Sequence, residues 1–232
     1  MQKVKEYVTL EAITKADRFS EFRDACKNYL GDYYLQNDKF TIVDHDSYIG
    51  YLTEYCIMQY ISDKYSKDGF YAESWEKKYD INRLLAIVYS NDKSEDNFEY
   101  VKDYFYDKYD IKISYKSKNI YIDVKTAFTQ KDPQDNWCFM YPVVQARKPG
   151  KDYMILTYYV TYENNPKSNI KEIYIAGYTS EMAIRNKKII RKGQYNRFHV
   201  ISQTDNYETI LNIDYKNIDN LFDLIKKEVE DE

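Results

Sequence analysis

Residues 110–125 constrain the fold of this chain more than any other stretch. They read Asp-Ile-Lys-Ile-Ser-Tyr-Lys-Ser-Lys-Asn-Ile-Tyr-Ile-Asp-Val-Lys, with apolar and polar side chains alternating on both sides of a polar centre. Alternation with a period of two is typical of a half-buried strand, so the stretch predicts two short strands joined by a turn. Residues two apart in a strand share a face. Asp123 and Lys125 are therefore expected on one side of the sheet, and Ile122 and Val124 on the other, apolar side.

A second acid opens the predicted hairpin. Asp110 precedes Asp123 by enough chain for one strand, a turn and most of a return strand, so both carboxylates are expected at one end of the hairpin. Two carboxylates that close repel each other unless a cation lies between them. Oxygen ligands of this kind favour Mg²⁺, and the Lys125 ammonium would steady an anionic oxygen or a nucleophilic water.

Asp110 and the triplet Asp123-Val-Lys125, followed by Thr126, resemble the active site of the PD-(D/E)XK nuclease superfamily. Residue 109 is Tyr, where the name-giving motif has Pro. The resemblance covers about residues 46–162, and the whole chain looks most like a type II restriction endonuclease. It implies an α/β fold with a mixed central β-sheet flanked by helices. It also implies Mg²⁺-dependent hydrolysis of phosphodiester bonds in duplex DNA, with Mn²⁺ able to substitute.

Glu54 is the third candidate acid. It lies in a helix predicted over residues 47–65, among apolar neighbours that include Leu52 and Met58. Many members of the superfamily carry a glutamate on the corresponding helix, pointing back to the metal, so the resemblance implies that Glu54 joins Asp110 and Asp123 as a metal ligand. The alternative is an ordinary glutamate on the solvent face of the helix.

Other interpretations of the hairpin stay open. An acid and a lysine two apart on a strand are often only a solvated face, and this lysine-rich chain offers several such triplets by chance. The same superfamily also contains repair nucleases, Holliday-junction resolvases and CRISPR-associated effectors. A nuclease fold without activity would serve as a nucleic-acid-binding module. The restriction-enzyme interpretation adds a homodimer, because cutting both strands of a palindrome requires two sites related by a two-fold axis.

Two basic segments are candidates for contact with nucleic acid. The first follows the predicted hairpin and contains Gln145, Arg147 and Lys148, whose side chains suit base edges and phosphates. The second is the run from 185 to 197, which holds no acid; its basic residues are Arg185, Lys187, Lys188, Arg191, Lys192 and Arg197. Solvated loops that only aid solubility are the alternative for both segments.

The remaining patterns predict one nuclease domain over residues 1–232, with a helical part over 1–45 and an extension over 163–232. Helices are expected over 16–29, 97–106, 180–185 and 218–229, and strands over 153–162 and 170–177. Residues 84–89 fit either a buried strand or a helix. Apolar stripes make the helices at 16–30 and 218–229 candidates for a contact between subunits, or for packing within the chain.

Composition narrows the function further. The net charge of −4 argues against a non-specific nucleic-acid coat, although a local basic cleft remains compatible with it. Three scattered cysteines and two histidines show no metal-ligand spacing, so neither a zinc site nor a disulfide framework is predicted. The longest apolar run, residues 84–89, is far too short to span a bilayer. We therefore expect a soluble protein of the cytoplasm.

Overall fold

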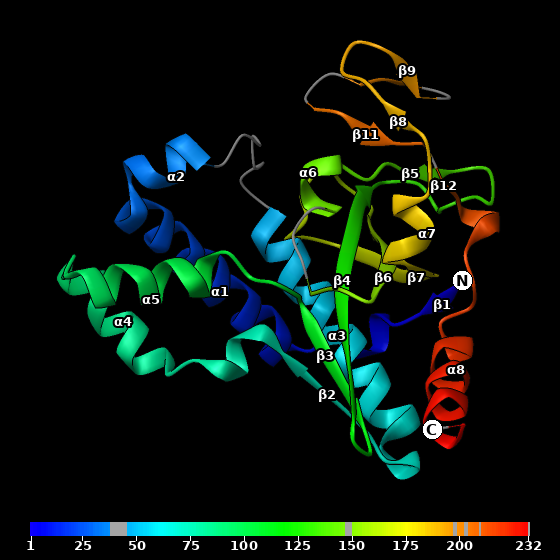
Figure 1. Cartoon of the computed structure of the whole chain (residues 1–232), viewed down its shortest axis with the longest axis horizontal. Helices are drawn as coiled ribbons and strands as arrows, with labels where there is room; N and C mark the ends of the chain where they lie inside the picture. Colours follow the sequence, from blue (N-terminus) through cyan, green and yellow to red (C-terminus); the bar gives the residue numbers. More distant parts are fainter. Residues whose placement is uncertain (38–45, 147–149, 197–198, 202–203, 209, 232) are drawn as a thin grey trace.

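A six-stranded mixed β-sheet with helices on its faces forms the centre of the molecule (Figure 1). The computed structural model describes residues 1–37, 46–146, 150–196, 199–201, 204–208 and 210–231. The strand order is β1-β7-β6-β4-β3-β2, in which β4 and β6 pair in parallel and the other neighbours pair antiparallel. The strands are β1 (Gln2–Lys3), β2 (Phe70–Ser74), β3 (Ile111–Tyr115), β4 (Lys118–Thr129), β6 (Tyr153–Thr161) and β7 (Ile170–Ser180). The predicted α/β class with a mixed central sheet is confirmed.

The predicted hairpin is β3 and β4. Ile111 pairs with Ile122, and the register continues to the turn, where Tyr115 pairs with Lys118. Ile122 and Val124 belong to the main core with the buried residues of α3 (Asp46–Tyr65), whereas Asp123 lies on the opposite face. The alternation seen in the sequence therefore places the two faces of β4 correctly.

One face of the sheet is covered by long helices. The helices α3 and α8 (Asp219–Glu230) pack on this face through one apolar core. A second core joins α1 (Leu10–Leu30) to α4 (Ile81–Ser90) and α5 (Glu95–Phe105), which form a separate group beside the sheet in Figure 1. A short helix, α2 (Asp32–Asn37), follows α1.

The apolar stripes proposed for a subunit contact are used inside the chain. Leu221 and Phe222 of α8 are fully buried in the main core, and Cys26 and Tyr29 of α1 are buried against α4 and α5. Of the two alternatives for these stripes, packing within the chain is the one observed. Residues 84–89, which fitted either a strand or a helix, belong to α4, whose capping residue Asp80 accepts a hydrogen bond from the Arg83 N–H.

The other face of the sheet carries smaller elements. They are β5 (Cys138–Phe139), α6 (Val143–Ala146), α7 (Glu181–Arg185) and β12 (Ile210–Leu211). A third apolar cluster, which includes Tyr141, Val143, Met154 and Ile184, joins them to the sheet. None of the helices in the described ranges is long and apolar enough to cross a membrane.

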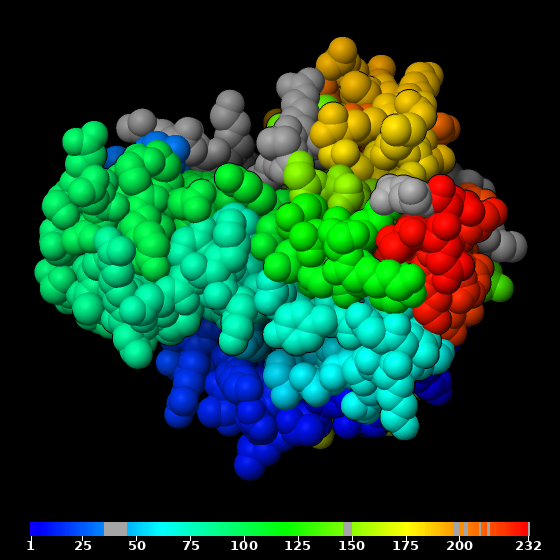
Figure 2. Space-filling model, turned by 60° about the horizontal axis from the view of Figure 1, so that its bottom comes forward, coloured from blue at the N-terminus to red at the C-terminus, as the bar shows by residue number. Residues whose placement is uncertain are grey.

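The C-terminal extension adds a small β lobe. Its strands are β8 (Ile189–Ile190), β9 (Tyr195–Asn196), β10 (His199–Val200) and β11 (Asn206–Tyr207). Figure 2 shows this lobe, in yellow and orange, projecting from the rest of the surface. The Tyr207 N–H donates to the Tyr141 carbonyl at 2.9 Å, and the Val143 N–H donates to the Asp205 carbonyl at 3.0 Å. The lobe is thus attached to the segment that leads into α6.

Candidate active site

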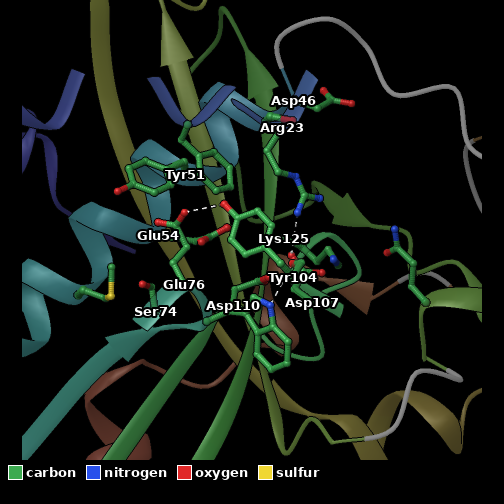
Figure 3. A pocket seen from close by; sticks show the side chains of 16 residues that line it. Arg23, Asp46, Tyr51, Glu54, Ser74, Glu76, Tyr104, Asp107, Asp110 and Lys125 are labelled. Carbon is green, nitrogen blue, oxygen red and sulfur yellow. Dashed lines mark hydrogen bonds and ion pairs between the residues drawn. The ribbon is translucent and has the colours of Figure 1, made fainter. Parts of the chain in front are cut away.

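A cavity of about 300 Å³ opens where β3 begins and β4 continues past it. Its walls come from α1, α3, the 3₁₀ turn Trp75–Lys78, the start of the β3–β4 hairpin and α6. The acids that line it are Asp46, Glu54, Glu76, Asp107 and Asp110, and the cations are Arg23 and Lys125. Figure 3 shows Glu54, Glu76, Asp107 and Asp110 gathered from separate elements, with Asp46 apart from them. Five carboxyl groups facing two cations make the cavity acidic.

Asp110 is fixed by the backbone of β4. Its carboxylate accepts the Val124 N–H at 2.5 Å, and its own N–H donates to the Ile122 carbonyl at 2.9 Å. Because the β3–β4 pairing stops at Ile111 and Ile122, the side chain of Asp110 continues the ladder by one further bond. Burial raises the pKa of Asp110 to about 7, and the negative charge of Asp123 adds to the shift.

Asp123 is the most enclosed acid of the group, with 2% of its surface exposed. The Lys151 ammonium contacts Oδ1, the Lys125 ammonium lies 3.0 Å from Oδ2, and the Tyr141 hydroxyl donates to Oδ2 at 3.0 Å. Burial alone would raise the pKa of Asp123, but the charges of Lys125 and Lys151 outweigh it and hold the pKa below its usual range. Asp123 is therefore an anion that is fully paired.

Lys125 connects Asp123 to the cavity. Its side chain remains 28% exposed and lines the cavity, as predicted for a lysine on the same face as Asp123. Burial acts to lower its pKa, but Asp123 and then Asp110 more than offset this, so the pKa of Lys125 stays above its usual value. The group is a cation at neutral pH, able to contact a phosphate oxygen.

Glu54 lies on the side of α3 that faces the cavity, not on a solvent face. Its pKa is raised well above the ordinary value by burial, and then by the charges of Asp110, Asp107 and Glu76; only Arg23 acts in the opposite direction among the named groups. Burial likewise raises the pKa of Glu76, whose carboxylate accepts the Tyr104 hydroxyl at 2.8 Å (Figure 3). Burial is the main cause of both shifts, and for Glu54 the neighbouring carboxylates add to it.

The donor set suits a hard divalent cation in its chemistry. Mg²⁺ takes carboxylate oxygens and keeps several waters, and the raised pKa of Glu54 and of Asp110 marks excess negative charge that such a cation would relieve. Across the described ranges, however, no three acidic, histidine or cysteine side chains are arranged to hold a metal ion. Asp123 in particular is engaged by its two lysines. The residues fit Mg²⁺ by type and charge.

Gln145 lies on α6 and lines the same cavity as Lys125 and the acids. Arg147 and Lys148, the other predicted contacts of this segment, lie outside the described residues. The segment from β5 to α6 therefore brings one of the three predicted side chains to the site.

The basic run lies on α7 and the β lobe, away from the cavity lining. Acids outside the run neutralise part of its charge. Arg191 pairs with Asp205 at 2.7 Å, and Arg185 pairs with Glu181 of the same helix, α7, at 2.6 Å. Lys188 and Lys192 are exposed and Lys187 is partly exposed. Arg197 lies outside the described residues. The folded surface is therefore less basic than the sequence of the run implies.

Several residues at the site were not predicted. Lys151 and Tyr141 complete the surroundings of Asp123, while Glu76, Asp107 and Arg23 complete the cavity. Lys151 lies two residues before the central strand β6, whose parallel pairing with β4 sets Tyr153 beside Ile122. Its place just before the strand predicted over 153–162 was the one signal available in the sequence. The others come from α1 and from loops whose approach no local pattern indicates.

Comparisons with protein-family models, with curated proteins and with solved structures give no match to this chain.

Proposed function

We propose that this protein is a Mg²⁺-dependent endonuclease that hydrolyses phosphodiester bonds of double-stranded DNA, most like a type II restriction enzyme. One observation carries the proposal. Asp110, Lys125 and Glu54 line one cavity. The Lys125 ammonium also lies 3.0 Å from Oδ2 of Asp123. Carboxylates that can hold a divalent cation, next to a lysine that can contact a phosphate, suit metal-assisted hydrolysis of a phosphodiester bond.

Each residue has a role in this proposal. Glu54, Asp110 and Asp123 supply the carboxylates for the cation. Lys125, held as a cation by Asp123, contacts the scissile phosphate and orients the attacking water. Tyr141 keeps Asp123 in place through its hydroxyl. Mg²⁺, or Mn²⁺ in its place, would offset negative charge on the phosphate and lower the pKa of a water when held by these carboxylates.

Duplex DNA is the proposed substrate, and the cytoplasm the proposed location. Gln145 borders the cavity, where its amide can reach a base edge, and the β lobe offers Lys187, Lys188 and Lys192 to the phosphate backbone. Cutting both strands of a palindrome requires two copies of the cavity, so we also propose a homodimer on DNA.

A second candidate function has its own observation. Both oxygens of Asp123 are engaged by cations or a hydroxyl, and no three-acid metal group is present among the described residues. A nucleic-acid-binding module without catalysis would use the basic lobe and would not need a free oxygen on Asp123. The retention of Lys125 beside the acids favours the enzyme.

The test is a cleavage screen. The protein is incubated with supercoiled plasmid, linear duplex, branched DNA, single-stranded DNA and RNA, each with Mg²⁺ and each with a chelator. Discrete plasmid fragments that require Mg²⁺ support the restriction enzyme. Cleavage confined to branched DNA assigns a resolvase, and cleavage confined to single strands or RNA assigns a defence or repair nuclease. Binding without cleavage of any substrate would favour the module.

A further inference from the structure

Two lysines contact the single carboxylate of Asp123. The Lys151 ammonium contacts Oδ1 and the Lys125 ammonium lies 3.0 Å from Oδ2, so one carboxylate faces two cations. The Tyr141 hydroxyl also donates a hydrogen bond to Oδ2. The cavity in front of Asp123 is acidic, whereas the carboxylate of Asp123 itself is held between two ammonium groups.

The two lysines differ in what they can reach. Lys125 lines the cavity and is 28% exposed, so its ammonium is open to a substrate. The Lys151 side chain is 5% exposed and approaches Asp123 from a position two residues before β6. A buried ammonium is costly unless it is paired. Asp123 is that partner, so Lys151 forms a buried ion pair with the site and is not open to a substrate.

We infer that Lys151 is an internal counter-cation that sets how tightly the site binds its divalent metal ion. The inference rests on the proposed function and deepens it. In the metal-free protein Lys151 holds Asp123 in place, which makes it a positioning residue. A divalent cation that approaches Asp123 meets two like charges, and it gains Oδ1 only when the Lys151 ammonium withdraws.

Substrate would reverse this balance. The phosphates of a bound nucleic acid bring negative charge to Lys125 and to the cavity, which compensates the cations around Asp123. Metal binding and nucleic-acid binding are then coupled, and by linkage each strengthens the other. Lys151 thereby opposes metal binding less when substrate is present than when it is absent.

The test measures metal affinity without nucleic acid. Mn²⁺ binding is followed by the electron paramagnetic resonance of free Mn²⁺ for the wild type and for Lys151→Met, which removes the ammonium and keeps an apolar stem. Lys151→Arg keeps the charge, and Lys171→Met removes a lysine that pairs with Asp132 on the surface. We expect Lys151→Met to bind Mn²⁺ about tenfold more tightly or better. The two controls should bind as the wild type does.

The outcomes separate this inference from the proposed function. Equal or weaker Mn²⁺ binding by Lys151→Met, with the wild type still binding, overturns the counter-cation and leaves the nuclease standing. Binding by neither protein overturns both. If Lys151→Met does not fold, the ¹⁵Nζ resonance of Lys151 in the wild type, assigned through Lys151→Arg, decides the matter. It should shift on saturation with Mg²⁺, and an unchanged resonance contradicts the inference.

Discussion

The carboxylate of Asp110 accepts the backbone N–H of Val124 at 2.5 Å, so a side chain takes the place of a strand carbonyl where β3 has ended. Val124 lies between Asp123 and Lys125 on β4. This single bond therefore fixes the first acid against the strand that carries the other two site residues. It also explains how Asp110 stays ordered beside a second buried carboxylate.

The stability of the metal-free protein should fall as the pH rises. The folded-state pKa of Asp110 is raised to about 7 and that of Glu54 is also raised, so the folded protein binds more protons than the unfolded chain from about pH 4 to 7. Stability from these protons is complete below the unfolded pKa and is lost as the pH passes the folded pKa. We expect the free energy of unfolding to drop by about 1–3 kcal/mol between pH 5 and 8.

Urea denaturation in a chelator, repeated across this pH window, measures the effect. Glu54→Gln should flatten the profile, since it removes one of the titrating acids. Glu21→Gln, an exposed acid on α1, serves as the matched control and should leave the profile unchanged. Parallel profiles for the wild type and Glu54→Gln would contradict the electrostatic description of the cavity.

Mg²⁺ should restore the stability that is lost at pH 8. A ligand that binds only the folded state stabilises it by about 2.7 kcal/mol at one hundred times its dissociation constant. We expect the melting temperature of the wild type to rise with Mg²⁺, and that of Asp110→Asn to rise much less. Differential scanning calorimetry at matched ionic strength distinguishes this from a salt effect. An equal rise in both proteins would exclude Asp110 from the cation site.

The sequence predicted the part of the site that lies on one local element. Asp123 and Lys125 are two apart on β4, and a period of two was sufficient to place both on the face opposite Val124. The helix at 47–65 was also predicted, with Glu54 inside it. The spacing of apolar residues identifies these elements, because that spacing depends only on which face of the element is buried.

The rest of the site depends on long-range packing. Lys151 reaches Asp123 because β6 pairs in parallel with β4, and Tyr141 reaches it because β5 and α6 cover that face. Glu76 and Asp107 enter the cavity from a 3₁₀ turn and a loop, where side-chain direction follows no period. The charge of the basic run was overestimated for the same reason, since Asp205 approaches Arg191 only in the folded chain.

The β lobe should contact phosphates. Reversal of Lys187, Lys188 and Arg191 to Glu is expected to weaken DNA binding and to reduce the slope of log affinity against log salt by about 2 to 3. Fluorescence anisotropy at several salt concentrations measures both quantities. The control reverses Lys5, Lys67 and Lys227, which are exposed elsewhere on the surface. A salt slope that is the same for both triple variants and the wild type would show that the run is only a solubilising surface.

DNA should bring two copies together. The apolar stripes of α1 and α8 are buried within the chain, so no dimer is expected to depend on them. Sedimentation velocity with and without duplex DNA measures the assembly, and we expect a complex of two chains on one duplex. A monomer under both conditions that nicks one strand would rule out the orthodox restriction enzyme and favour a nicking or repair nuclease.

The central claim is that Asp123 and Lys125 carry a Mg²⁺-dependent cleavage reaction, and cleavage of supercoiled plasmid tests it most directly. Asp123→Asn and Lys125→Ala are compared with the wild type and with Lys112→Ala, which removes a lysine of the same hairpin that pairs with Glu73. Circular dichroism confirms that each variant is folded. We predict cleavage by the wild type and by Lys112→Ala in Mg²⁺, and a loss of roughly 10²-fold or more in the other two. Undiminished cleavage by folded Lys125→Ala or Asp123→Asn would contradict the assignment.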